Sequence, residues 1–369
     1  MRIVLGFLPI LMTAGAAMLA YALAVYPIRE QVSRARKDET LGGLIGPTDA
    51  RSSILRVYYE DSGVDVKRLD DVLWAGRTVL TPYVGYGEAP GHQHNAYIDS
   101  HQFRGHKKLT TPKPANVTRI FLTGASTAFG SGASSDDRTI GAYLQGLFDR
   151  REAPSGHHYE VFTFATPAWS STQERIAIEN RISELEPDLV IELTGVADCF
   201  YGQLGRNVLW ARGFHDQHYW QLMNSAFARA GFKRMTDVQD ASSQPVPPGT
   251  VGARLKKNVQ LAAYALSLQN ARLHVFLQPV LPVTTKALSP REATMGTRLA
   301  SGLDPDYFRE CYRQIAEGFG VGIPANAAFT NLSSVFDSVP ETEEIFLDNA
   351  HFGDRGNLAI AVAIAEAVR

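Results

Sequence analysis

From about residue 117 onward, apolar runs typical of strands alternate with amphipathic runs typical of helices. Strands that alternate with helices indicate a parallel sheet covered on both faces. We therefore predict an α/β protein, specifically a three-layer α/β/α sandwich with a mostly parallel sheet. The expected strands cover 117–124, 159–165, 188–195, 273–279 and 329–336, and the expected helices cover 139–151, 171–186 and 358–368.

Two short segments supply a serine, a histidine and a carboxylate. Ser126 follows the first expected strand in Gly124-Ala125-Ser126, and Asp348-Asn349-Ala350-His351 precedes the last expected helix. A serine hydroxyl becomes a good nucleophile when an imidazole takes its proton and a carboxylate holds that imidazole in the right tautomer. Because ligands bind at the carboxyl ends of parallel strands, we expect Ser126 to be a nucleophile, His351 its general base and Asp348 the residue that orients His351.

Four sequence blocks in this order resemble those of the SGNH (GDSL-like) hydrolase superfamily, over roughly residues 80–369. The blocks are Gly124-Ala125-Ser126, residues 164–171, Gly195-Val196-Ala197-Asp198 and Asp348-Asn349-Ala350-His351. The resemblance implies a serine esterase or O-acyltransferase that works through an acyl-serine and needs no cofactor or metal. Its substrate would be an acyl ester, such as an acylated glycan of the cell envelope.

The resemblance also implies an oxyanion hole made by the backbone N–H groups of Ser126 and Ala165, with Gly124, Gly195 and Asp198 in supporting places. The asparagine that usually donates a side-chain amide to the oxyanion is replaced by Ala197. The loss of one such donor lowers the rate by ~10²–10³. Two functions therefore stay open, an enzyme and a catalytically degenerate binding or assembly component with the same fold.

The N-terminal run, residues 3–26, is strongly apolar and almost uncharged. A helix of this length spans about 36 Å, enough to cross a bilayer core of ~30 Å. We expect a transmembrane helix at 1–26, although a signal peptide is the alternative, then a stalk and irregular lead-in at 27–116. The main domain would cover 117–369, with an insertion at about 200–250.

An envelope substrate favours a single-pass protein of the cell inner membrane whose main domain faces the periplasm or the exterior. The basic residues that follow the apolar run favour the opposite orientation by the positive-inside rule. The sequence therefore leaves the orientation open. The aromatic stretch at 200–232 is a candidate lid or a surface for a protein partner.

The overall composition is that of an ordinary globular protein. The net charge of −2, with no basic stripe, does not favour nucleic-acid binding. The two cysteines, Cys199 and Cys311, form either one disulfide or two separate buried thiols. Four histidines, His92, His94, His101 and His106, lack an accompanying carboxylate or cysteine cluster, so no metal site is predicted.

Overall fold

The computed structural model describes residues 78–93, 96–151, 154–206, 223–233, 244–297 and 304–368. The predicted N-terminal helix at 1–26 and the first part of the stalk and lead-in lie outside these residues. In the part of the chain that is described, no helix is both long and apolar enough to span a membrane. The domain boundaries stay predictions.

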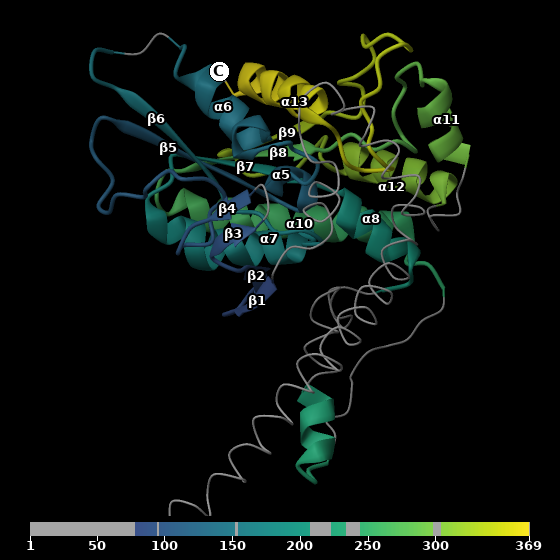
Figure 1. Cartoon of the computed structure of the whole chain (residues 1–369), viewed down its shortest axis with the longest axis horizontal. Helices are drawn as coiled ribbons and strands as arrows, with labels where there is room; N and C mark the ends of the chain where they lie inside the picture. The colour runs from purple at the N-terminus through teal and green to yellow at the C-terminus, as the bar shows by residue number, and fades with distance from the viewer. Residues whose placement is uncertain are drawn as a thin grey trace, which may run out of the picture.

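A parallel five-stranded sheet forms the centre of the molecule, in the order β6-β5-β7-β8-β9 (Figure 1). Every neighbouring pair of these strands is parallel. The central strand β7 is buried at all six positions, as expected when both faces of a sheet are covered. The strands are β5 (Val117–Gly124), β6 (His158–Thr163), β7 (Leu189–Thr194), β8 (Arg272–Leu277) and β9 (Ala327–Asn331).

Helices cover both faces of the sheet, which makes a three-layer α/β fold (Figure 1). One apolar core packs α6 (Ile140–Phe148) and α13 (Asp354–Ala367) on the first face. A second core packs the other face with α7 (Ser171–Ala177), α8 (Val196–Gln203), α10 (Pro248–Ser267) and α12 (Pro305–Gly318). The short α5 (Ser126–Phe129) follows β5, and α11 (Pro290–Thr297) follows β8.

Several element boundaries differ from the sequence prediction. The last strand was expected at 329–336, but β9 ends at Asn331 and turns follow it. The last helix begins at Asp354, four residues earlier than expected, because Gly353 is its N-cap. The helix expected at 171–186 continues from α7 into a π-helical turn, η4 (Ile178–Ile182), and a 3₁₀ turn, η5 (Ser183–Leu185).

The lead-in is more regular than predicted. It contains two antiparallel hairpins, β1 (Thr78–Thr81) with β2 (Gly85–Glu88), and β3 (Gly91–Gln93) with β4 (Ala96–Ile98). Arg104 then pairs with Thr163 at the end of β6, so the lead-in extends this edge of the central sheet. The lead-in therefore lies against the carboxyl end of β6.

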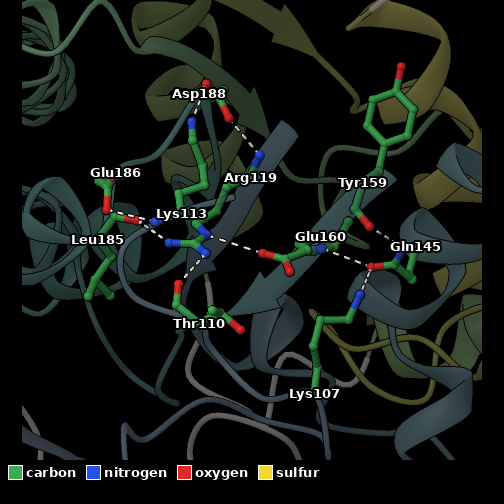
Figure 2. A network of polar contacts seen from close by, with 11 residues as sticks. Lys107, Thr110, Lys113, Arg119, Gln145, Tyr159, Glu160, Leu185, Glu186 and Asp188 are labelled. Carbon is green, nitrogen blue, oxygen red and sulfur yellow. Dashed lines mark hydrogen bonds and ion pairs between the residues drawn. The ribbon is translucent and has the colours of Figure 1, made fainter. Parts of the chain in front are cut away.

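A polar network closes the opposite, amino-terminal end of the sheet (Figure 2). The buried Arg119 on β5 donates to Glu160 on β6 and to the carbonyls of Thr110 and Leu185. Asp188 accepts from the Arg119 N–H at 2.6 Å and pairs with Lys113. Because each guanidinium nitrogen of Arg119 already has a protein acceptor, this side chain links the strands and the loops before them rather than a ligand.

Candidate active site

Ser126 lies in a tight turn at the carboxyl end of β5. Gly124 has a left-handed φ of 149°, and a Cβ there would lie 2.3 Å from the carbonyl oxygen of Leu193 on β7. Only glycine fits this close approach between the strands. The chain therefore leaves the sheet directly into α5, with Ser126 as its first residue.

Asp348 shapes the turn that carries His351. One oxygen of the Asp348 carboxylate accepts from the N–H groups of Ala350 (2.7 Å) and His351 (2.9 Å). Its other oxygen lies 2.8 Å from Nδ1 of His351. Burial raises the pKa of Asp348, but the neighbouring His351 and these hydrogen bonds outweigh it and hold that pKa below its usual value. The carboxylate is thus kept ionised beside the imidazole.

The fold brings these two segments together across the sheet edge. Nε2 of His351 lies 2.7 Å from Oγ of Ser126, although the residues are 225 positions apart in the sequence. Both Asp348 and His351 are almost fully buried. The three groups form a continuous hydrogen-bonded chain, in which the imidazole can accept the serine proton while the carboxylate stabilises the resulting positive charge.

Gln278 connects the two segments that carry Ser126 and His351. It follows β8, and its Nε2 donates to Oγ1 of Thr127 (3.0 Å) and, at 3.4 Å, to the carbonyl of Ala350. These bonds join the residue after Ser126 to the residue before His351. The place of Gln278 after a strand, at the same sheet edge as Ser126, is the sequence signal that would have indicated it.

A fully buried ion pair fixes the segment that leads to Asp348. Glu292 accepts from Lys286 Nζ at 2.7 Å, and both side chains have no exposed surface. The same carboxylate accepts from the N–H groups of Ile345 (2.8 Å) and Phe346 (3.0 Å). The chain just before Asp348 is therefore held by a charged group rather than by apolar packing alone.

The second block lies beside the nucleophile turn. The N–H groups of Phe164 and Thr166 donate to Leu122 (2.8 Å) and Gly124 (3.2 Å) on β5. Since successive N–H groups of a strand point to opposite edges, the N–H of Ala165 points away from β5. Ala165 is also buried. This geometry does not favour the predicted contact between the Ala165 N–H and an oxyanion at Ser126.

Ala168 has the backbone conformation that a glycine would normally adopt in this block. Its φ is +66°, in the left-handed region, and the residue is partly exposed. Within the described parts of the chain, the Ala168 N–H donates no backbone hydrogen bond. Pro167 directly before it is the turn signal that the sequence analysis passed over.

The third block, residues 195–198, is hydrogen-bonded to the second block, residues 164–171. Gly195 has a φ of 110°, and a Cβ there would lie 2.4 Å from Leu277. Asp198 on α8 accepts from the N–H (2.9 Å) and the hydroxyl (2.6 Å) of Ser171. Burial raises the pKa of Asp198 and outweighs the lowering effect of these bonds. Ala197 is partly exposed at the start of α8 and has no side-chain donor to offer.

The cysteines form one disulfide. Cys199 on α8 is bonded to Cys311 on α12, which settles the choice that the sequence left open. The residue next to Asp198 is thereby tied covalently to the outer helix layer.

Of the histidines in the lead-in, His92 and His106 lie near Tyr97, whose ring stacks on His106 at 4.2 Å between centroids. His94 lies outside the described residues. In the described ranges no group of three or more His, Cys, Asp or Glu side chains could hold a metal ion. Residues 207–222 of the aromatic stretch at 200–232 also lie outside them, so the predicted lid stays a prediction.

No protein-family model and no curated protein matches the sequence. Solved structures similar to this chain include the acetylxylan esterase Axe2 from Geobacillus stearothermophilus, at 12% identity and a TM-score of 0.38 over 68% of this chain and 94% of that chain. A lipase from a goat rumen metagenome is 11% identical, with a TM-score of 0.41 over 68% of this chain and 97% of that chain. A putative GDSL-like lipase from Parabacteroides merdae is 15% identical, with a TM-score of 0.40 over 71% of this chain and 100% of that chain. These values are too low to assign a function.

Proposed function

We propose that this protein is a serine-dependent ester hydrolase or O-acyltransferase. The observation that carries the proposal is the hydrogen-bonded chain from the buried Asp348 through the buried His351 to the partly exposed Ser126, with contacts of 2.8 and 2.7 Å. Such a chain activates a serine hydroxyl for attack on a carbonyl. Its members come from two segments that the fold alone brings together.

In the first half-reaction, His351 Nε2 takes the proton of Ser126 as Oγ attacks the carbonyl carbon of the ester. The tetrahedral intermediate collapses, and the leaving alcohol takes that proton from His351. An acyl-serine remains. Asp348 stabilises the imidazolium and keeps Nδ1 protonated throughout.

In the second half-reaction, water or a sugar hydroxyl gives a proton to His351 and attacks the acyl-serine. The proton then returns to Ser126 as the acid or the new ester leaves. Water gives hydrolysis, whereas a sugar hydroxyl gives acyl transfer.

For the oxyanion we propose two backbone donors, the N–H of Ser126 and the N–H of Ala168. Ala168 replaces Ala165 in this role because it is partly exposed and left-handed in φ, while the N–H of Ala165 points away from β5. With Ala197 in place of a side-chain donor, the expected rate is ~10²–10³ below that of a site with three donors.

Acylated glycans of the cell envelope are the substrates we propose, with the apolar N-terminal run as a single-pass anchor in the inner membrane and the main domain outside the cytoplasm. Support for the anchor comes from the length and apolarity of residues 3–26. A protein partner at 200–232 is proposed on the aromatic content of that stretch.

Turnover of p-nitrophenyl acetate by the full-length protein and by Ser126→Ala tests the enzymatic proposal. Release of p-nitrophenol that disappears in Ser126→Ala supports a working nucleophile. Acetylated glycans, assayed for free acetate and for acetyl transfer onto unmodified glycan, then separate hydrolysis from transfer. An envelope glycan substrate is excluded if neither product forms.

A catalytically degenerate binding component is the second candidate, and Ala197 is the observation that favours it. A fluorophosphonate probe separates the two candidates, because it labels only an activated serine. A folded protein that stays unlabelled would favour the binding component.

A further inference from the structure

The turn after β6 has a backbone conformation that its sequence does not favour. The carbonyl of Thr166 accepts from the N–H of Trp169 at 3.2 Å, with Pro167 and Ala168 between them. A proline at the second position and a left-handed φ at the third are the pattern of a type II turn, which normally has glycine third. Ala168 holds φ = +66° in that position. Without outside contacts, rotation of the central peptide would give the type I turn that a Pro-Ala pair accepts without strain.

Two tyrosines from different parts of the fold hold the carbonyls of this turn. Tyr201 on α8 donates its hydroxyl to the carbonyl of Ala168 at 2.9 Å. Tyr86 on β2 donates its hydroxyl to the carbonyl of Pro167 at 3.4 Å. The indole N–H of Trp169 in turn donates to the carbonyl of Tyr86 at 3.0 Å. Hydrogen bonds from both the lead-in and α8 therefore hold this turn.

The carbonyl of Pro167 and the N–H of Ala168 belong to the same trans peptide and point in opposite directions. A bond that fixes this carbonyl therefore fixes the direction of the N–H. We infer that Tyr86 and Tyr201 are positioning residues: Tyr86 holds the central peptide through the Pro167 carbonyl, and Tyr201 anchors the next peptide through the Ala168 carbonyl, so that the Ala168 N–H faces an oxyanion at Ser126. This inference rests on the proposed function, since it assigns the orientation of a donor in the same site.

Both tyrosines are themselves held firmly. Tyr86 is fully buried, and Tyr201 has only 4% of its surface exposed. Tyr201 lies two residues from the disulfide at Cys199 and on the same helix as Asp198, which binds Ser171 just beyond the turn. Rigid tyrosines of this kind would keep the Ala168 N–H from reorienting during the reaction, as an oxyanion donor requires.

The test uses the full-length protein with Tyr86→Phe and Tyr201→Phe, each of which removes one hydroxyl and no ring. Tyr307→Phe is the matched control, because its hydroxyl also donates to a backbone carbonyl, that of Val246 at 2.6 Å, away from the turn. Two quantities are measured, kcat and KM on p-nitrophenyl acetate, and hydrogen–deuterium exchange of the amides at 164–171.

The inference predicts that either tyrosine change lowers kcat by about five- to tenfold, leaves KM within about twofold, and speeds exchange at the Thr166 and Trp169 amides. Tyr307→Phe changes neither. In an Ala168→Gly background, the same tyrosine changes lower kcat by less than about twofold, because glycine accepts the left-handed φ without strain.

The inference would be overturned if Tyr86→Phe and Tyr201→Phe both show the same amide exchange and the same kcat as Tyr307→Phe. If the unsubstituted protein shows no Ser126-dependent turnover, the proposed function fails, and the exchange measurement alone decides whether the tyrosines hold the turn. Unchanged amide exchange in Tyr86→Phe and Tyr201→Phe then overturns the inference. Faster exchange at Thr166 and Trp169 supports the claim that the two hydroxyls hold the turn.

Discussion

Glu192→Gln should stabilise the protein, and more strongly as the pH rises. Glu192 lies on the central strand β7 and faces Glu174 on α7, with no exposed surface to speak of on either side chain. Burial, and to a smaller extent the nearby Asp198, raise the pKa of Glu192 from an ordinary value of 4.5 to about 8, and a hydrogen bond from Glu174 only partly offsets them. Burial, Glu192 and Asp198 likewise raise the pKa of Glu174. Glu192 therefore keeps at neutral pH a proton that the unfolded chain would release.

The sign of the effect follows from proton binding. The folded protein holds this proton more tightly than the unfolded chain, so the free energy of unfolding is highest below pH 4.5. It falls as the pH rises toward about 8 and levels off above that value. Each pH unit in this window lowers the free energy of unfolding by about 1.4 kcal/mol. The loss of stability therefore reaches up to about 3 kcal/mol at pH 7. A glutamine at position 192 stays neutral at every pH, and its side-chain oxygen can accept the hydrogen bond from protonated Glu174, so this pH-dependent loss of stability disappears.

Urea unfolding of the parent and of Glu192→Gln at pH 4.5, 6 and 7.5 measures the difference. We expect the two midpoints to converge at pH 4.5 and to separate progressively above it, with Glu192→Gln the more stable. Glu341→Gln, at an exposed loop position, serves as the control and should follow the parent at every pH. A Glu192→Gln variant that is less stable than the parent at pH 7.5 would refute the claim that buried Glu192 holds a proton in the folded protein.

Three further predictions concern the site and its support. Asp348→Asn should lower kcat by about three to four orders of magnitude with little change in KM, because no carboxylate then holds the imidazole in the reactive tautomer or balances its positive charge. A kcat within tenfold of the parent in steady-state assays would contradict this role. Ala197→Asn should raise kcat at least about tenfold by restoring a side-chain donor, and an unchanged or lower kcat would show that the donor set is already complete. Removal of the disulfide in Cys199→Ala/Cys311→Ala should lower the free energy of unfolding by about 4–5 kcal/mol, since it closes a loop of 112 residues; an unchanged urea midpoint would argue against that cross-link.

Local pattern was sufficient to predict the core of the fold. The apolar runs before Ser126 and after Asp188 became β5 and β7, which are buried over nearly their whole length. A parallel sheet hides both strand faces, so its strands are readable as continuous apolar runs. The short hairpins of the lead-in gave no such signal, because each strand has only three or four residues.

The part of the site that depends on residue type and spacing could be predicted from the sequence. Ser126, Asp348 and His351 have distinctive side chains, and the structure brings them together. The backbone donor could not be found in that way, since an N–H is common to almost every residue and its direction depends on the ladder and the turn. The position of Gln278 after a strand could be read from the sequence, but the two segments that it joins are known only from the structure.

The most direct test of the account is mass spectrometry of the full-length protein after reaction with a fluorophosphonate. We predict one adduct, located on Ser126, that forms slowly or not at all in His351→Ala. An unlabelled Ser126 in a protein shown to be folded, or labelling at the same rate without His351, would contradict the claim that the chain from Asp348 to Ser126 activates a nucleophile.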